Sequence, residues 1–175
     1  RIERCSHSRQ PVVELDLSEL NLEDFPQELR NLAGLKVIDL SNNQLISLPP
    51  EIGELDQLVD LFLMANQLLS LPREIGRLSA LSRLDLTENL LSELPEEIGR
   101  LSALSSLSLA GNQLGILPKQ IKRLTNLREL ILYGNELKEI GPELGELCCL
   151  SSLDLSGNYL TTLPAEIGKL QNLRE

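Results

Sequence analysis

Hydrophobic residues recur along the chain with a fixed step of 23 residues. In each copy of this step, positions 1, 4, 6, 11, 14, 18 and 21 hold only Leu, Ile, Val or Phe. The seven copies align without insertion or deletion and begin at Val12, Leu35, Leu58, Leu81, Leu104, Leu127 and Leu150. So regular a pattern predicts a stack of seven copies of one structural unit.

Within a copy, the pattern changes from strand-like to helix-like. Positions 3 to 6 alternate polar and apolar residues, which indicates a short strand that turns its leucines inward. In most copies, Pro at position 15 and Glu at position 17 suit the first turn of a helical segment, and Gly at position 19 keeps it to about one turn of 3₁₀ or α-helix. One copy alone buries too little apolar surface to offset its chain entropy, so the copies are expected to stack with their strands in one parallel sheet.

Asparagine recurs at position 9, where the chain leaves the strand. Its amide is expected to satisfy the backbone groups of neighbouring turns. The first copy carries Leu20 at this position and Asn21 beside it, so its turn is expected to differ. The sixth copy departs at Ile140-Gly141-Pro142. The asparagines are Asn43, Asn66, Asn89, Asn112, Asn135 and Asn158.

Each copy follows the motif L-x-x-L-x-L-x-x-N-x-L and adds a second half, L-P-x-x-I-G-x-L, which is clearest at residues 71–78 and 94–101. It resembles the leucine-rich repeat family. The 23-residue form resembles the Ras-group subclass, which includes the Ras suppressor protein, Erbin- and Scribble-type scaffolds, plant relatives and the repeat domains of Roco GTPases. The resemblance implies an α/β solenoid, a horseshoe with a parallel concave sheet and short 3₁₀ or α segments on its convex side. It also implies a non-catalytic protein-binding module.

The repeat also divides the chain. Residues 1–11 are expected to be a leader or partial N-terminal cap, residues 12–172 the seven copies, and residues 173–175 the start of a truncated eighth. Because the first residue is Arg1 rather than Met, the sequence is interpreted as a piece of a longer protein.

Composition excludes several classes of partner. The 175 residues include 44 leucines, with 16 Lys and Arg against 26 Asp and Glu, a formal charge of -10. This balance argues against nucleic acid, which requires a basic face, and against an anionic membrane surface. No apolar run is long enough to span a bilayer, so membrane insertion is not expected.

Residues that could carry chemistry are few. His7 is the single histidine and falls in the leader, while Cys5, Cys148 and Cys149 have no C-x-x-C spacing. Neither a phosphate-binding glycine loop nor a dinucleotide fingerprint is present. The sequence therefore predicts no enzyme, no cofactor and no metal site. Two neighbouring carboxylates, Asp16 and Asp39, could contribute to a Ca²⁺ site, but two ligands are too few. Spare thiols and the lack of N-x-[ST] acceptors favour a cytoplasmic location.

A partner is expected on the concave face, defined here as positions 2, 3, 5, 7 and 8 of every copy. These positions hold nine acids and three bases. Their excess negative charge creates an electrostatic field that would steer a basic partner to this face. Two apolar islands, Phe62 with Met64 and Ile131 with Tyr133, lie three copies apart, or about 15 Å. Glycine at position 8 of the last three copies was expected to give a partner more room. The candidate partner-binding residues are Asp39, Asp60, Phe62, Met64, Arg83, Asp85, Arg128, Ile131, Tyr133 and Asp154.

Two functions fit this face. The first is an intracellular signalling scaffold or adaptor that binds a protein, such as a small GTPase or another signalling protein with a basic or mixed surface. The second is the sensor or regulatory arm of a larger catalytic protein, such as a Roco GTPase, a kinase or a bacterial effector ligase. A purely structural spacer is a weaker third hypothesis, because it leaves the apolar islands without a role.

Overall fold

The computed structural model describes residues 13–32 and 34–174. In this part of the chain, three-residue strands alternate with five-residue 3₁₀ helices. The strands are β1 (Glu14–Asp16), β2 (Val37–Asp39), β3 (Asp60–Phe62), β4 (Arg83–Asp85), β5 (Ser106–Ser108), β6 (Glu129–Ile131) and β7 (Ser152–Asp154). The helices are η1 (Gln27–Asn31), η2 (Pro50–Glu54), η3 (Arg73–Arg77), η4 (Glu96–Arg100), η5 (Lys119–Arg123), η6 (Pro142–Glu146) and η7 (Ala165–Lys169). The predicted leader, residues 1–11, lies outside the described residues.

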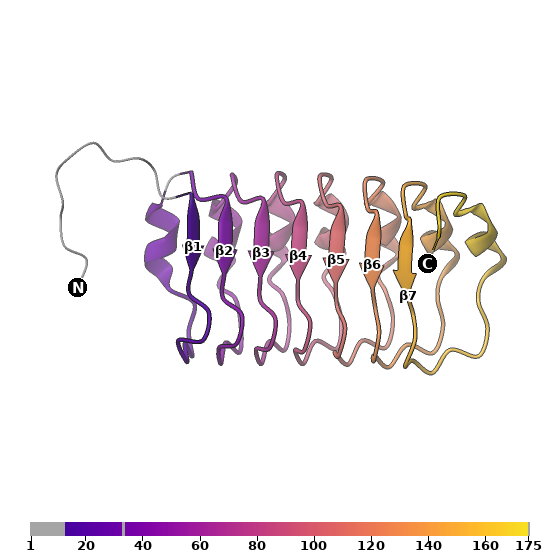
Figure 1. Cartoon of the computed structure of the whole chain (residues 1–175), viewed down its shortest axis with the longest axis horizontal. Helices are drawn as coiled ribbons and strands as arrows, with labels where there is room; N and C mark the ends of the chain where they lie inside the picture. The colour runs from indigo at the N-terminus through magenta and orange to yellow at the C-terminus, as the bar shows by residue number, and fades with distance from the viewer. Residues whose placement is uncertain (1–12, 33, 175) are drawn as a thin grey trace.

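The strands form one sheet in chain order, β1 to β7, and every neighbouring pair is parallel. Each residue pairs with the residue 23 positions later, as in Leu84↔Leu107↔Leu130. Figure 1 shows the strands side by side along one face of the molecule, with the helical turns on the opposite face. The α/β solenoid with a parallel concave sheet is therefore confirmed.

The core is an aliphatic column between the sheet and the helices. In copies two, three, four and six, all seven apolar positions are buried, and in copy five only Leu117 is partly exposed. Position 4 of the strands points inward, with Leu84 and Leu107 almost inaccessible to water. Since every copy contributes the same set of side chains, each leucine packs against its equivalents in the copies on either side.

Asparagine at position 9 forms a hydrogen-bonded ladder beside this column. The side-chain amide of Asn89 donates to the carbonyl oxygens of Leu63 (2.9 Å), Leu86 (3.1 Å) and Thr87 (3.3 Å). Its Oδ1 accepts the backbone N–H of Leu68 at 3.0 Å. The bonds reach into the preceding copy, so the amide joins two turns where the sheet ladder ends. The same set of bonds recurs at the neighbouring asparagines.

The irregular copies behave as their sequences predict. In the first copy, both Glu19 and Asn21 adopt the left-handed backbone conformation (φ 58° and 57°). With no asparagine at position 9 there, Oδ1 of Asn43 accepts two backbone N–H groups of this turn, from Leu20 and Leu22. In the sixth copy, Gly141 takes the capping position that proline holds elsewhere, and η6 keeps its register.

Glycine at position 19 has a second role that the sequence did not reveal. A Cβ on Gly76 would lie 2.6 Å from the carbonyl oxygen of Glu97 in the next copy. Glycine therefore lets successive helical turns approach closely on the convex side. Copies one and five carry Arg30 and Lys122 instead of glycine at this position. Hollows of about 230 and 750 Å³ lie beside these two residues, between their copies and the copies that follow.

We expect Gly76→Ala to lower the free energy of unfolding by about 1–3 kcal/mol, because the added methyl must push two turns apart. Gly168 is the matched control, since it occupies the same position of the last copy and a Cβ there meets nothing within 4 Å. Denaturant unfolding followed by circular dichroism compares the two variants. Equal stability of the two variants would contradict the close-approach explanation.

Candidate protein-binding face

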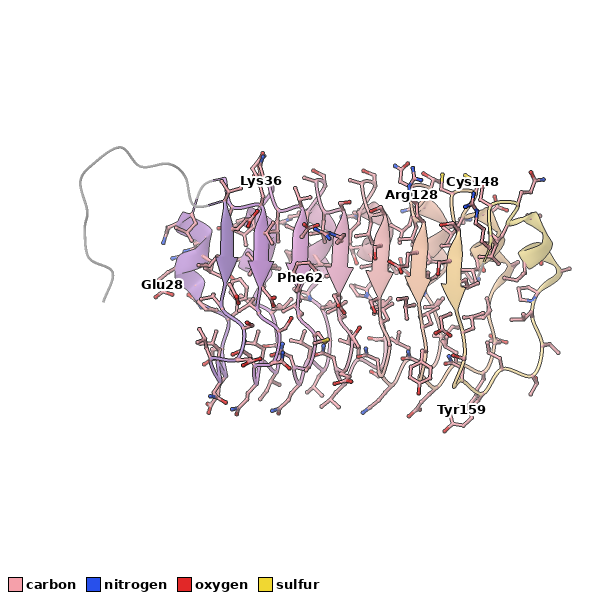
Figure 2. The ribbon with its side chains drawn as sticks, in the orientation of Figure 1. Glu28, Lys36, Phe62, Arg128, Cys148 and Tyr159 are labelled. Atoms are coloured by element: carbon pink, nitrogen blue, oxygen red, sulfur yellow. The ribbon has the colours of Figure 1, made fainter. Side chains whose placement is uncertain are left out.

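The concave face consists of straight rows of side chains, because the strands pair in register. Position 5 gives the row Asp16, Asp39, Phe62, Asp85, Ser108, Ile131 and Asp154. Of the ten predicted residues, Arg83, Arg128, Tyr133 and Asp154 are exposed, Asp39, Phe62, Met64, Asp85 and Ile131 are half-buried, and Asp60 is buried. Figure 2 shows Phe62 on the face turned toward the viewer.

Three of these residues form one cluster on β3 and β4. Arg83 donates from Nε to Oδ1 of Asp60 at 2.7 Å and from Nη2 to Oδ2 at 2.5 Å. Its guanidinium also lies over the ring of Phe62, with Cζ 5.7 Å from the ring centroid, in cation–π geometry. The hydrogen bonds and charge of Asp60 raise the pKa of Arg83 above its ordinary value.

This cluster corrects two expectations about exposure. The side chain of Asp60 is only 8% exposed, so its charge is neutralised by Arg83 instead of being free to attract a partner. Phe62 is half-buried below the guanidinium, whose own side chain is 58% exposed. The group presented to a partner is therefore the flat arginine, held in place by the acid and the ring.

The four aspartates of the position 5 row have a local structural role that was missed. One carboxylate oxygen of each accepts the backbone N–H of the residue two positions later, at 2.8–2.9 Å, where the chain leaves the strand. The sequence carries a signal for this, since Asp at position 5 always occurs with Ser or Thr at position 7. The pairs are Asp16–Ser18, Asp39–Ser41, Asp85–Thr87 and Asp154–Ser156.

The pKa of Asp154 lies below 3.8 because the hydroxyl and backbone N–H of Ser156 both donate to it. A lowered folded-state pKa means that these bonds stabilise the fold above about pH 3.8 and lose this effect as the pH falls further. We expect Ser156→Ala to raise the pKa of Asp154 towards 3.8, as measured by NMR titration of the carboxyl carbon. Asp16, bonded in the same way to Ser18, is the internal control. An unchanged pKa of Asp154 would contradict this role of the hydroxyl.

The second predicted island lies on β6 and the turn after it. Tyr133 is 54% exposed, while Ile131 is half-buried. Between the islands, β5 presents two small residues, Ser106 and Ser108. Their hydroxyl groups bond to Glu129 (2.7 Å) and Thr87 (2.7 Å). The structure therefore does not bring the two islands together, and a hydroxyl-lined strip separates them.

Glycine at position 8 has a backbone explanation. Every copy adopts a positive φ at this position, from 53° at Ala65 to 67° at Gly134. Glycine is favoured there because the left-handed region strains other residues. The extra room expected for a partner is thus a by-product of a turn geometry that all copies share.

Exposed apolar residues also lie along the edge where the strands end, and these were missed. Figure 2 places Tyr159 at this edge. The signal was present, because apolar side chains occur at positions 9, 10, 12 and 13, outside the repeat's seven core positions. The residues are Leu20, Ile46, Leu69, Leu90, Ile116 and Tyr159.

The structure describes residues 13–32 and 34–174, and these ranges bear on metal binding and membrane insertion. No group of three or more His, Cys, Asp or Glu side chains in these ranges could hold a metal ion. Cys148 and Cys149 are free thiols, the first exposed and the second half-buried. None of the described helices has the length and apolarity needed to cross a membrane.

Comparisons with solved structures agree with this architecture. A leucine-rich repeat protein of Leptospira interrogans is 42% identical over 88% of this chain and 39% of its own, with a TM-score of 0.86. The ectodomain of the Arabidopsis thaliana receptor kinase GASSHO1/SCHENGEN3, solved in complex with Casparian strip integrity factor 2, is 42% identical over 86% of this chain and 19% of its own, with a TM-score of 0.80. An internalin of Listeria monocytogenes, 23% identical over 92% of this chain and 46% of its own, shares the fold with a TM-score of 0.79.

The chain spans less than half of the length of each of these three proteins. None of the curated proteins matches the sequence. Family models described as "Leucine Rich Repeat", "Leucine rich repeat" and "Leucine Rich repeats (2 copies)" match residues 34–55, 56–114 and 125–175. Since these matches extend over most of the repeated region and the solved relatives share its sheet and turns, the chain belongs to the leucine-rich repeat family.

Proposed function

We propose that the chain is a non-catalytic module that binds a protein or peptide segment on its concave face, between the Arg83 cluster and Tyr133. The observation that carries this proposal is the fixed, exposed guanidinium of Arg83, bonded twice to Asp60 and stacked on Phe62. A planar cation already held in one geometry loses little entropy on binding, which is typical of interface anchors.

The partner that fits this face has mixed character. The aspartates of the position 5 row favour basic residues, while the faces of Arg83 and Tyr133 suit aromatic or acidic groups at defined points. The strip of small hydroxyl-bearing residues between them leaves space for a main chain. A signalling protein with a basic or mixed surface, such as a small GTPase, meets these requirements. Leucine-rich repeats mediate protein–protein interactions. The proposal also includes two features of the Ras-group subclass, namely a scaffold role and a cytoplasmic location.

A second arrangement is supported by one comparison. The receptor kinase relative uses its repeats as the ectodomain of a longer catalytic protein and was solved with a bound factor. We propose as the alternative that these repeats form the sensor or regulatory arm of a larger protein. In both arrangements, the concave face is the binding surface.

The concave assignment can be tested by site-specific photo-crosslinking. A benzophenone amino acid is placed at Ser108 on the concave face, or at the exposed Arg100 on the convex face, and each protein is expressed in its native cells. We expect a partner to be captured from position 108 only. For the captured partner, Arg83→Gln with Tyr133→Ala should weaken binding at least about tenfold. Capture from position 100 alone, or unchanged affinity of the double variant, would contradict the proposal.

A further inference from the structure

A separate hollow of about 500 Å³ lies at the edge where the strands begin, beside β6 and β7. Figure 2 shows Arg128 and Cys148 at this edge. The lining residues are Arg128, Cys149, Ser151, Ser152, Asn172 and Arg174. In a chain with a net charge of -10, these six residues include two arginines and no carboxylate.

The repeat places the two arginines on either side of a serine. Arg128, Ser151 and Arg174 all occupy position 2, in successive copies. The backbone N–H of Ser151 donates to the carbonyl oxygen of Arg128 at 2.8 Å, and that of Arg174 donates to Ser151 at 2.9 Å. The backbone hydrogen bonds between successive copies thus continue to Arg174. Neighbouring strands lie about 4.8 Å apart, so the two guanidinium groups originate about 10 Å from each other and can converge on one group between them.

The neutral side chains of the hollow are held in place. Ser151 Oγ donates to the carbonyl oxygen of Arg128 at 3.0 Å. The side-chain amide of Asn172 donates to the carbonyl oxygen of Cys148 at 2.7 Å. The second N–H of this amide remains available for a ligand, as does the hydroxyl of Ser152. The lining therefore offers neutral hydrogen-bond donors beside two charged side chains.

The nearest acids on the sheet are bonded elsewhere. Glu129 accepts the hydroxyl of Ser106 at 2.7 Å, in the copy away from the hollow, and Asp154 is held by Ser156 at the other end of its strand. Within residues 13–32 and 34–174, the ion pairs join other residues and leave Arg128 and Arg174 without a carboxylate partner. The two guanidinium groups are thus available to bind an anion.

From this arrangement we infer that the hollow binds a phosphate monoester, carried by a phosphorylated serine or threonine of a segment bound to the repeats. A phosphate monoester has three terminal oxygens and close to two negative charges at neutral pH, which match two forked guanidinium groups and two neutral donors. A carboxylate, with two oxygens and one charge, would leave donors unused. The inference rests on the proposed function, because the phosphorylated group belongs to the bound partner.

The probe for the test is a short blocked peptide, acetyl-Gly-phosphoserine-Gly-amide, titrated into the whole chain at fixed ionic strength. Chemical shifts in the NMR spectrum are expected to change around Arg128 and Arg174. Arg128→Gln and Arg174→Gln should each weaken binding at least about tenfold, whereas Arg128→Lys, which keeps the charge but loses the fork, should have an intermediate effect. Arg100→Gln, on the convex side, is the matched control and should have no effect.

Two neighbouring thiols provide an independent readout. Cys149 lines the hollow, while Cys148 is exposed and does not. The bound phosphopeptide is expected to slow alkylation of Cys149 by N-ethylmaleimide and to leave that of Cys148 unchanged, as located by tandem mass spectrometry. Equal protection by inorganic sulfate, or by a control peptide with glutamate in place of phosphoserine, would overturn the inference, as would equal slowing of both thiols. Neither result depends on Arg83 or Tyr133, so failure here is distinguishable from failure of the proposed function.

Discussion

Replacing Leu107 with alanine should lower the free energy of unfolding by about 3–5 kcal/mol. Leu107 is 0% exposed on β5 and lies in register between Leu84 and Leu130. Both neighbours are held by their own strands, so the wall of the cavity cannot collapse inward, and the cost should fall in the upper part of the range for such replacements. The measurement is denaturant unfolding monitored by circular dichroism, with the m-value checked because repeat arrays can unfold in parts.

The matched control is Leu69→Ala. This leucine is 54% exposed, at the edge where the strands end. We expect a change within about 0.5 kcal/mol, as is usual for surface replacements. A loss below about 1 kcal/mol for Leu107→Ala, or equal losses for the two variants, would mean that the leucines do not form one shared column.

Asn89→Ala should have the second largest effect, about 2–4 kcal/mol. The amide is buried and makes four bonds, to the carbonyl groups of Leu63, Leu86 and Thr87 and from the N–H of Leu68. Alanine leaves the buried N–H of Leu68 without a partner, at a cost of about 1–3 kcal/mol, and removes one of the two donors of each carbonyl group. The donors that remain are Asn66 for Leu63, Asn112 for Leu86 and the backbone N–H of Ala65 for Thr87. Thermal and denaturant unfolding measure the loss.

Asn126→Ala is the control for this prediction. Its amide is exposed and makes a single bond, to the carbonyl oxygen of Ser102 at 2.8 Å. Water can replace that bond, so we expect a loss below about 1 kcal/mol. If Asn89→Ala were as mild as this control, the position 9 ladder would be a consequence of the stacking and not one of its causes.

Much of the concave face could be predicted from the sequence, but not which of its charges are free. The period showed that Asp60, Phe62 and Arg83 lie on the concave side. It did not show that Asp60 and Arg83 pair, because each side chain could have extended into solvent or toward either neighbouring strand. Only the packed sheet, with Phe62 below the guanidinium, selects this arrangement. A count of acids therefore overstates the field that a partner meets.

The repeat itself could be read without a structure because each copy meets the same physical requirements. An apolar residue at seven of every 23 positions, an asparagine after the strand and a short helical turn are local features, and stacking repeats them. Contacts between copies are less evident in the sequence. The close approach at Gly76, the positive φ at position 8 and the donor-lined hollow at Arg128 depend on how neighbouring copies are placed. The sequence alone thus determined the period and the inward side of the chain. The tertiary structure alone decided which side chains meet, because those pairs are 21 or more residues apart and form only after stacking.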